Sequence, residues 1–96
     1  MRVRLLDEAQ SDLRQIYSWI ADDSPASARK MVASIRQQVL GLADFPLVAP
    51  EYEDVPGCRR LVLLPYPYAA FYRVNQQAGV VEVLRVLHTA RQWPAL

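Results

Sequence analysis

The chain has 96 residues, of which 52% are hydrophobic and 22% are charged, and its formal net charge is +1. This length allows a single domain, which we place at residues 1–96, and the composition excludes a disordered chain. No apolar run reaches the roughly 18–20 residues that a membrane-spanning helix needs, and an early acid, Asp7, argues against a signal peptide.

The charge is divided unevenly along the chain. Residues 1–54 carry six basic and nine acidic side chains, a net −3, whereas residues 55–96 carry five arginines and the single acid Glu82, a net +4. A protein that grips many phosphates usually has a strongly positive balance, which this chain lacks. The only cysteine, Cys58, can form no internal disulfide and has no ligand cluster beside it, so we expect a reducing cytoplasm and no metal site.

The N-terminal half predicts one strand and two helices. Residues 2–6 (RVRLL) predict a strand, and Asp7 with Gln10 resembles a capping box that opens a helix. Apolar residues then recur at helical spacing, which gives one apolar stripe. The stripe consists of Ala9, Leu13, Ile16, Tyr17 and Ile20. Trp19 lies off this stripe and is either a flank of the core or an exposed partner contact.

A break at residues 22–25 separates the two helices. Ser24 can cap the second helix and Pro25 suits its first position, where no backbone donor is needed. A second stripe follows at Ala28, Val32, Ile35, Val39 and Leu42. Two amphipathic helices joined by a tight turn predict an antiparallel hairpin that packs on a sheet.

The C-terminal half predicts three strands after a proline-rich loop with an acidic centre. The strands are expected at residues 58–64, 68–75 and 80–88, and their short connections favour antiparallel neighbours. The expected fold is α+β, in the order β-α-α-β-β-β, with the helical hairpin on one face of a small antiparallel sheet. Strict alternation in the last strand puts Val83 and Val86 on opposite faces, and the pattern leaves open which face the helices cover.

Few residues suggest catalytic chemistry. A Cys58–His88 nucleophilic pair is conceivable, but a lone cysteine that opens a strand is more often a small hydrophobe. His88, Arg91 and Trp93 follow the last strand, where they form either a recognition surface or a clamp over the end of the core; composition alone favours the clamp.

Six short motifs follow one another along the chain: Ala9-x-x-x-Leu13-x-x-Ile16-Tyr17, Pro25-x-x-Ala28, Leu42-x-x-Phe45-Pro46, Gly57-x-Arg59-Arg60-Leu61, Phe71-Tyr72-Arg73-Val74 and Val86-Leu87-His88-x-x-Arg91-x-Trp93. In this order they resemble the motifs of the RelE/ParE toxins, the toxin components of type II toxin–antitoxin pairs. The series covers nearly the whole chain, and its last piece is the most diagnostic of the ParE-like, plasmid-stabilisation branch.

The resemblance implies one of two activities. RelE-like members are mRNA endonucleases of the ribosomal A site, whereas ParE-like members inhibit DNA gyrase. Arg60 matches a cationic position of the RelE site, but Val62 and Ala69 stand where that site has cations, and no tyrosine follows Tyr72. A variant nuclease set of Glu51 or Glu53 with Arg73 and His88 survives as the alternative, and an inert relative is a third hypothesis. Cleavage of mRNA depends on cations and acid–base groups, so the absence of cations at Val62 and Ala69 and of a later tyrosine favours the ParE interpretation.

We therefore expect a cytoplasmic gyrase-binding toxin, with no catalytic residues, cofactor or metal, that a ParD-like antitoxin neutralises. The expected target-binding residues are Arg60, Arg73, His88, Arg91 and Trp93. The expected antitoxin-binding residues are Leu13, Tyr17, Trp19 and Ile20. No membrane contact is expected, and DNA is expected to be met only indirectly, through the antitoxin complex.

Overall fold

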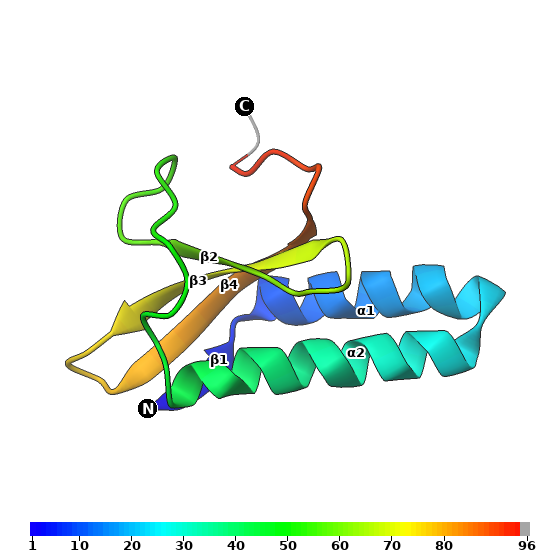
Figure 1. Cartoon of the computed structure of the whole chain (residues 1–96), viewed down its shortest axis with the longest axis horizontal. Coiled ribbons are helices and arrows are strands. Elements are labelled where there is room, and N and C mark those ends of the chain that lie inside the picture. Colours follow the sequence, from blue (N-terminus) through cyan, green and yellow to red (C-terminus); the bar gives the residue numbers. More distant parts are fainter. Residues whose placement is uncertain (95–96) are drawn as a thin grey trace.

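The computed structural model describes residues 1–94, which form two helices and a four-stranded sheet (Figure 1). The elements are β1 (Arg2–Leu5), α1 (Asp7–Asp23), α2 (Pro25–Leu40), a 3-10 turn (Gly41–Ala43), β2 (Arg59–Val62), β3 (Tyr68–Asn75) and β4 (Val80–His88). The order β-α-α-β-β-β and the central position of the last strand are confirmed, because the strands lie side by side as β1-β4-β3-β2. Neither helix has the length and hydropathy that a bilayer crossing requires.

The sheet is mixed, so the expectation of a purely antiparallel sheet is wrong for one pair. β2, β3 and β4 are antiparallel neighbours, but β1 pairs with β4 in parallel, from Arg2 opposite Val80 to Leu5 opposite Val83. Parallel neighbours need a long crossover, and the helical hairpin and two strands between β1 and β4 provide it. The short loops that predicted antiparallel pairing join only the last three strands.

The two helices begin in different ways. The capping box expected at Asp7 and Gln10 is wrong, because the N-cap residue of α1 is Leu6, which makes no side-chain cap. Asp7 lies inside the first turn, where its charge favours the helix dipole, and Gln10 Nε2 donates to the Leu5 carbonyl at 2.9 Å. At α2 the prediction is confirmed: Ser24 Oγ accepts the Ser27 N–H at 3.2 Å, and Pro25 is the first helical residue.

Both helices cover one face of the sheet, and the main core lies between these layers (Figure 1). Its helical members include Leu13, Ile16, Ile35 and Val39. Three residues of the predicted stripes lie at the margin instead: Tyr17 is 36% exposed, and Ile20 and Val32 are half-buried.

A β-bulge in β4 decides which of its side chains face the helices. Phe71 is paired with Arg85 but Tyr72 with Val83, so Leu84 has no partner of its own in β3. Val83 and Val86 consequently both enter the helix-side core, whereas Leu84 turns to the opposite face. The strict alternation expected from the sequence holds as far as Leu84 and is wrong for Val86 and Leu87, because an extra residue reverses the phase of a strand.

A second, smaller cluster lies on the sheet face that the helices leave uncovered. Its buried members are Cys58, Ala69, Phe71 and Leu87, with Tyr52, Val55, Leu84 and Trp93 packed around them. The loop before β2 and the C-terminal segment lie on this side of the sheet (Figure 1). They cover the part of the face near the end of β4 and leave the remainder open.

Candidate interaction site

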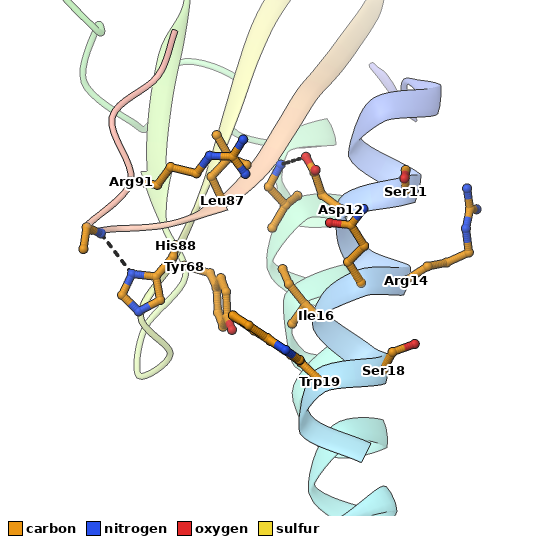
Figure 2. Close-up of a pocket in the computed structure, with 13 residues that line it drawn as sticks. Ser11, Asp12, Arg14, Ile16, Ser18, Trp19, Tyr68, Leu87, His88 and Arg91 are labelled. Atoms are coloured by element: carbon orange, nitrogen blue, oxygen red, sulfur yellow. Dashed lines mark hydrogen bonds between the residues drawn. The ribbon is translucent and has the colours of Figure 1, made fainter. Parts of the chain in front are cut away.

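A groove of about 990 Å³ runs between α1 and the end of β4. Figure 2 shows Ile16 and Trp19 projecting from α1 toward Tyr68, with His88 and Arg91 on the opposite wall. The groove is lined by Ser11, Asp12, Arg14, Gln15, Ile16, Ser18, Trp19, Tyr68, Val86, Leu87, His88, Ala90 and Arg91. An apolar floor with the cation Arg91 on one wall suits an amphipathic, acidic partner rather than a small polar substrate.

The turn after β4 is held by backbone hydrogen bonds. Thr89 N–H donates to the Pro67 carbonyl and Arg91 N–H to the His88 carbonyl, each at 2.9 Å. His88 Nδ1 accepts the Ala90 N–H at 3.0 Å, and its ring meets the Tyr68 ring edge-on at a centroid distance of 5.6 Å. Both His88 and Arg91 remain exposed. The fold thus fixes the backbone of this turn while leaving two side chains free to meet a partner.

Trp19 forms the most exposed apolar part of the groove. It is 75% exposed, although Ile16, one turn earlier on the same helix, is buried. Burial of a tryptophan removes a large apolar area from water, so leaving this one exposed forgoes a sizeable stabilisation. Of the two alternatives that the sequence left open for Trp19, the structure therefore favours an exposed residue over one that flanks the core.

An ion pair joins α1 to β4 beside the bulge. Arg85 donates to Asp12 through Nε at 2.8 Å and through Nη2 at 2.9 Å, and Val86 N–H donates to Asp12 Oδ2 at 3.0 Å. These hydrogen bonds raise the pKa of Arg85 above its ordinary value, against the opposing effect of burial. This pair was not predicted from the sequence, although β4 carries a single arginine in a nearly continuous apolar run, which is the signal that could have indicated it.

The structure separates the five residues predicted to bind the target. His88 and Arg91 line the groove. Trp93 is half-buried on the other sheet face, where its ring lies 4.8 Å from Phe71 and 6.2 Å from Tyr52. Its carbonyl accepts a hydrogen bond from the Tyr52 hydroxyl, so Trp93 acts as a clamp, as composition alone suggested.

The two predicted strand arginines also lie outside the groove. The Arg60 guanidinium stands 5.9 Å from the centre of the Phe71 ring, and Arg73 pairs with Glu82 at 2.9 Å. Phe71 belongs to the cluster on the uncovered face, which places Arg60 on that face too. The predicted set therefore forms two surfaces rather than one.

The predicted antitoxin-binding residues are divided as well. Trp19 faces the groove, whereas Tyr17 lines a second depression, of about 430 Å³, between the two helices. Ile20 is half-buried against the core. Leu13 needs correction as a contact residue: it lines the second depression but is only 2% exposed, so it presents almost no surface to a partner.

The possible catalytic sets are not assembled. Cys58 is 1% exposed, and burial raises the pKa of its thiol, which favours the unreactive protonated form. Arg73 and His88 belong to opposite ends of the β3–β4 ladder, because His88 pairs with Tyr68, five residues or about 17 Å along β3 from Arg73. Among residues 1–94, no three His, Cys, Asp or Glu side chains are grouped so that they could hold a metal ion.

A helical hairpin on one face of a mixed four-stranded sheet, in the order β-α-α-β-β-β, is the architecture of the RelE/ParE class of toxins. Residues 3–93 match the family described as ParE toxin of type II toxin-antitoxin system, parDE, so this chain belongs to the ParE toxin family.

Individual relatives agree with this assignment. The chain is 34% identical to the protein named "Putative toxin Y4kP" of Sinorhizobium fredii (strain NBRC 101917 / NGR234), over 97% of this chain and 93% of that one. A structure titled chromosomal ParDE TA system from P. aeruginosa is 30% identical, with a TM-score of 0.79 over 92% of this chain and 95% of that one.

A more distant structure shares the fold. The RelBE2 toxin–antitoxin complex of Mycobacterium tuberculosis is 23% identical, with a TM-score of 0.69 over 91% of this chain and 95% of that one. The chain is thus the toxin component of a type II toxin–antitoxin system in the ParE/RelE superfamily.

Proposed function

We propose that this toxin inhibits DNA gyrase by direct binding, without cleaving a bond, and that a ParD-like antitoxin neutralises it. The ParE family match supports gyrase as the target class, and the structure titled a ParDE system supports a ParD-like partner. The exposed groove gives both partners a surface of suitable chemistry, apolar along α1 and cationic at the exit of β4.

The observation that carries this proposal is the pairing of Val62 with Ala69 across β2 and β3. By the resemblance, these are two of the positions at which RelE-like nucleases have cations, and here two uncharged side chains are direct neighbours across the strands. Loss of a single group that stabilises developing charge commonly costs about 10²–10³ in rate. Two such losses side by side favour a binding function over cleavage.

The antitoxin is expected to occupy the groove along α1. Trp19 and Ile16 offer an apolar strip, and His88 and Arg91 stand opposite them, which suits a helix with an apolar face and acidic flanks. Antitoxin segments of this kind commonly fold as they bind, so their apolar side chains need a preformed groove of this sort.

Supercoiling of relaxed plasmid by purified gyrase tests the proposal. We expect micromolar toxin to inhibit supercoiling and equimolar ParD-like antitoxin to restore it. Undiminished supercoiling at micromolar toxin would contradict the proposal.

Primer extension on translated mRNA tests the alternative, an mRNA endonuclease. We expect an uncut message in the presence of the toxin. Codon-specific cuts that disappear in the His88→Ala variant would identify a nuclease instead.

A further inference from the structure

The sheet face opposite the helices carries a group of arginines that the groove does not use. Val3 and Leu5 pack into the helix-side core, so Arg2 and Arg4, which alternate with them in β1, point to the opposite face. Arg73 and Glu82 lie on that face as cross-strand partners, and Arg60 lies over Phe71 on the same side. Four arginines therefore share one surface.

The strand register places these arginines close together. Arg4 and Arg73 both stand opposite Glu82, one from β1 and the other from β3, so the three residues form a row across the sheet. Arg2 lies two residues from Arg4, about 6–7 Å along the strand, and Arg60 is a diagonal neighbour of Arg73. Each arginine thus lies within about 10 Å of another along or across the strands, close enough for more than one to meet a single polyanion.

The charge on this face is unbalanced at the side that carries Arg2 and Arg4. Glu82 is the only acidic residue in the four strands, and it is already paired with Arg73. The acids of the loop before β2, Glu51, Glu53 and Asp54, line a depression with Arg60 and so offset charge at the opposite margin only. The two remaining strand arginines are engaged elsewhere: Arg85 binds Asp12, and Arg59 donates to the Ala49 carbonyl at 2.7 Å. Arg2 and Arg4 are exposed, and the side chain of Arg73 keeps 54% of its surface despite its ion pair. Such a surface attracts a polyanion.

The geometry points to duplex DNA as the partner of this arginine face, defined as Arg2, Arg4, Arg60 and Arg73. Single-stranded nucleic acids are normally held by bases that stack on exposed aromatic rings. Here the aromatic rings pack on one another: Phe71 is 2% exposed beneath Trp93 and Tyr52. The face therefore offers cations for backbone phosphates but no open ring for a base, which suits sequence-independent contact with a duplex.

This inference revises the expectation that DNA is met only through the antitoxin. The low overall charge of the chain hides how the strands gather basic side chains on one face. The binding is expected to be weak, because only about three or four phosphates can be neutralised. Such weak binding to DNA contributes most where another protein already holds the DNA nearby.

Fluorescence anisotropy of a short labelled DNA duplex with the purified toxin alone tests this inference. We expect a micromolar dissociation constant at about 50 mM salt, and a log–log salt slope of about −3. The double variant Arg2→Gln/Arg4→Gln should weaken binding by about tenfold or more and reduce the slope by about 2. The matched control, Arg29→Gln/Lys30→Gln on the exposed side of α2, removes the same charge and should bind within about twofold of the unaltered toxin.

Three results would overturn the inference: no binding at about 100 μM toxin in low salt, an equal loss in both double variants, or tighter binding to the single strand than to the duplex. Circular dichroism of both variants checks that they are folded. Because gyrase is absent from this assay, its outcome is separate from that of the supercoiling test.

Discussion

At the scale of single residues, the Asp12–Arg85 pair is the contact that most clearly joins the helical layer to the sheet. The Asp12 side chain is 8% exposed and that of Arg85 is 18% exposed, so both charges are largely removed from water. A buried charge is tolerated when its partner and hydrogen bonds are complete, and becomes costly when one partner is removed. Asp12 also accepts the Val86 N–H next to the bulge, so it stabilises the strand just before the groove.

We predict that Asp12→Ala destabilises the fold by about 3 kcal/mol, because Arg85 loses its partner and the Val86 N–H its acceptor. Urea unfolding measures this change. The control is Glu8→Ala: Glu8 is 76% exposed and lies 3.5 Å from the same arginine, so its removal should change the unfolding free energy by less than about 0.5 kcal/mol. Equal effects of the two substitutions would contradict the assigned role of Asp12.

A second prediction concerns Cys58. Burial raises the pKa of its thiol, so the native chain holds the thiol protonated at a pH where an exposed cysteine, with a pKa of about 8.5, already ionises. We expect Cys58 to react with a thiol reagent at pH 8.5 at least 100-fold more slowly in the native chain than in urea, roughly. Equal rates would show that the strand opens readily or that the thiol is accessible.

At the scale of elements, α1 serves two purposes with two sides of one helix. One side supplies the core through Leu13 and Ile16, and Trp19 projects from the other margin into the groove. The sequence predicted the helix and its stripe well, because apolar side chains at a period of 3.6 residues can be buried together on one face. Whether Trp19 is covered depends on how far the end of β4 and the following turn reach toward the helix, which is a tertiary property.

The prediction for this element is that Trp19→Ala leaves the unfolding free energy within about 0.5 kcal/mol but weakens antitoxin binding roughly 30-fold, as expected for an interfacial aromatic anchor. Isothermal titration calorimetry with the ParD-like antitoxin measures the affinity. Leu40→Ala is the matched control, since Leu40 is 57% exposed at the end of α2 and outside the groove. Unchanged affinity of the Trp19 variant would remove the groove from the antitoxin interface.

The positions of the strands could be predicted from apolar runs between prolines and a glycine. The sheet face to which each side chain of β4 points could not be predicted. The bulge at Leu84 reverses the alternation midway, and nothing in the run from Val80 to Leu87 marks the extra residue. The parallel partner of β1 was missed for a related reason, because pairing between distant segments leaves no local signal.

At the scale of the whole molecule, the two proposed binding surfaces lie on different sides of one sheet. The groove with His88 and Arg91 lies between α1 and the end of β4. The arginine face belongs to the sheet side opposite the two helices, which both cover the same side (Figure 1). The sequence singled out His88 and Arg91 as candidate target-binding residues, but it grouped them with Arg60, Arg73 and Trp93. Only the register separates these residues, because it sets the distance between side chains on neighbouring strands.

The central claim is that the exit of β4 binds gyrase and does not perform chemistry. The most direct test measures gyrase supercoiling against toxin concentration for the unaltered chain, for His88→Ala/Arg91→Ala and for the control Arg29→Ala/Lys30→Ala. All four positions are exposed, so the variants should remain folded. We predict that the unaltered chain and the control inhibit equally, and that the groove variant needs at least about tenfold more protein, since two interface contacts are lost. Full inhibition by the groove variant, or none by the unaltered chain, would contradict the claim.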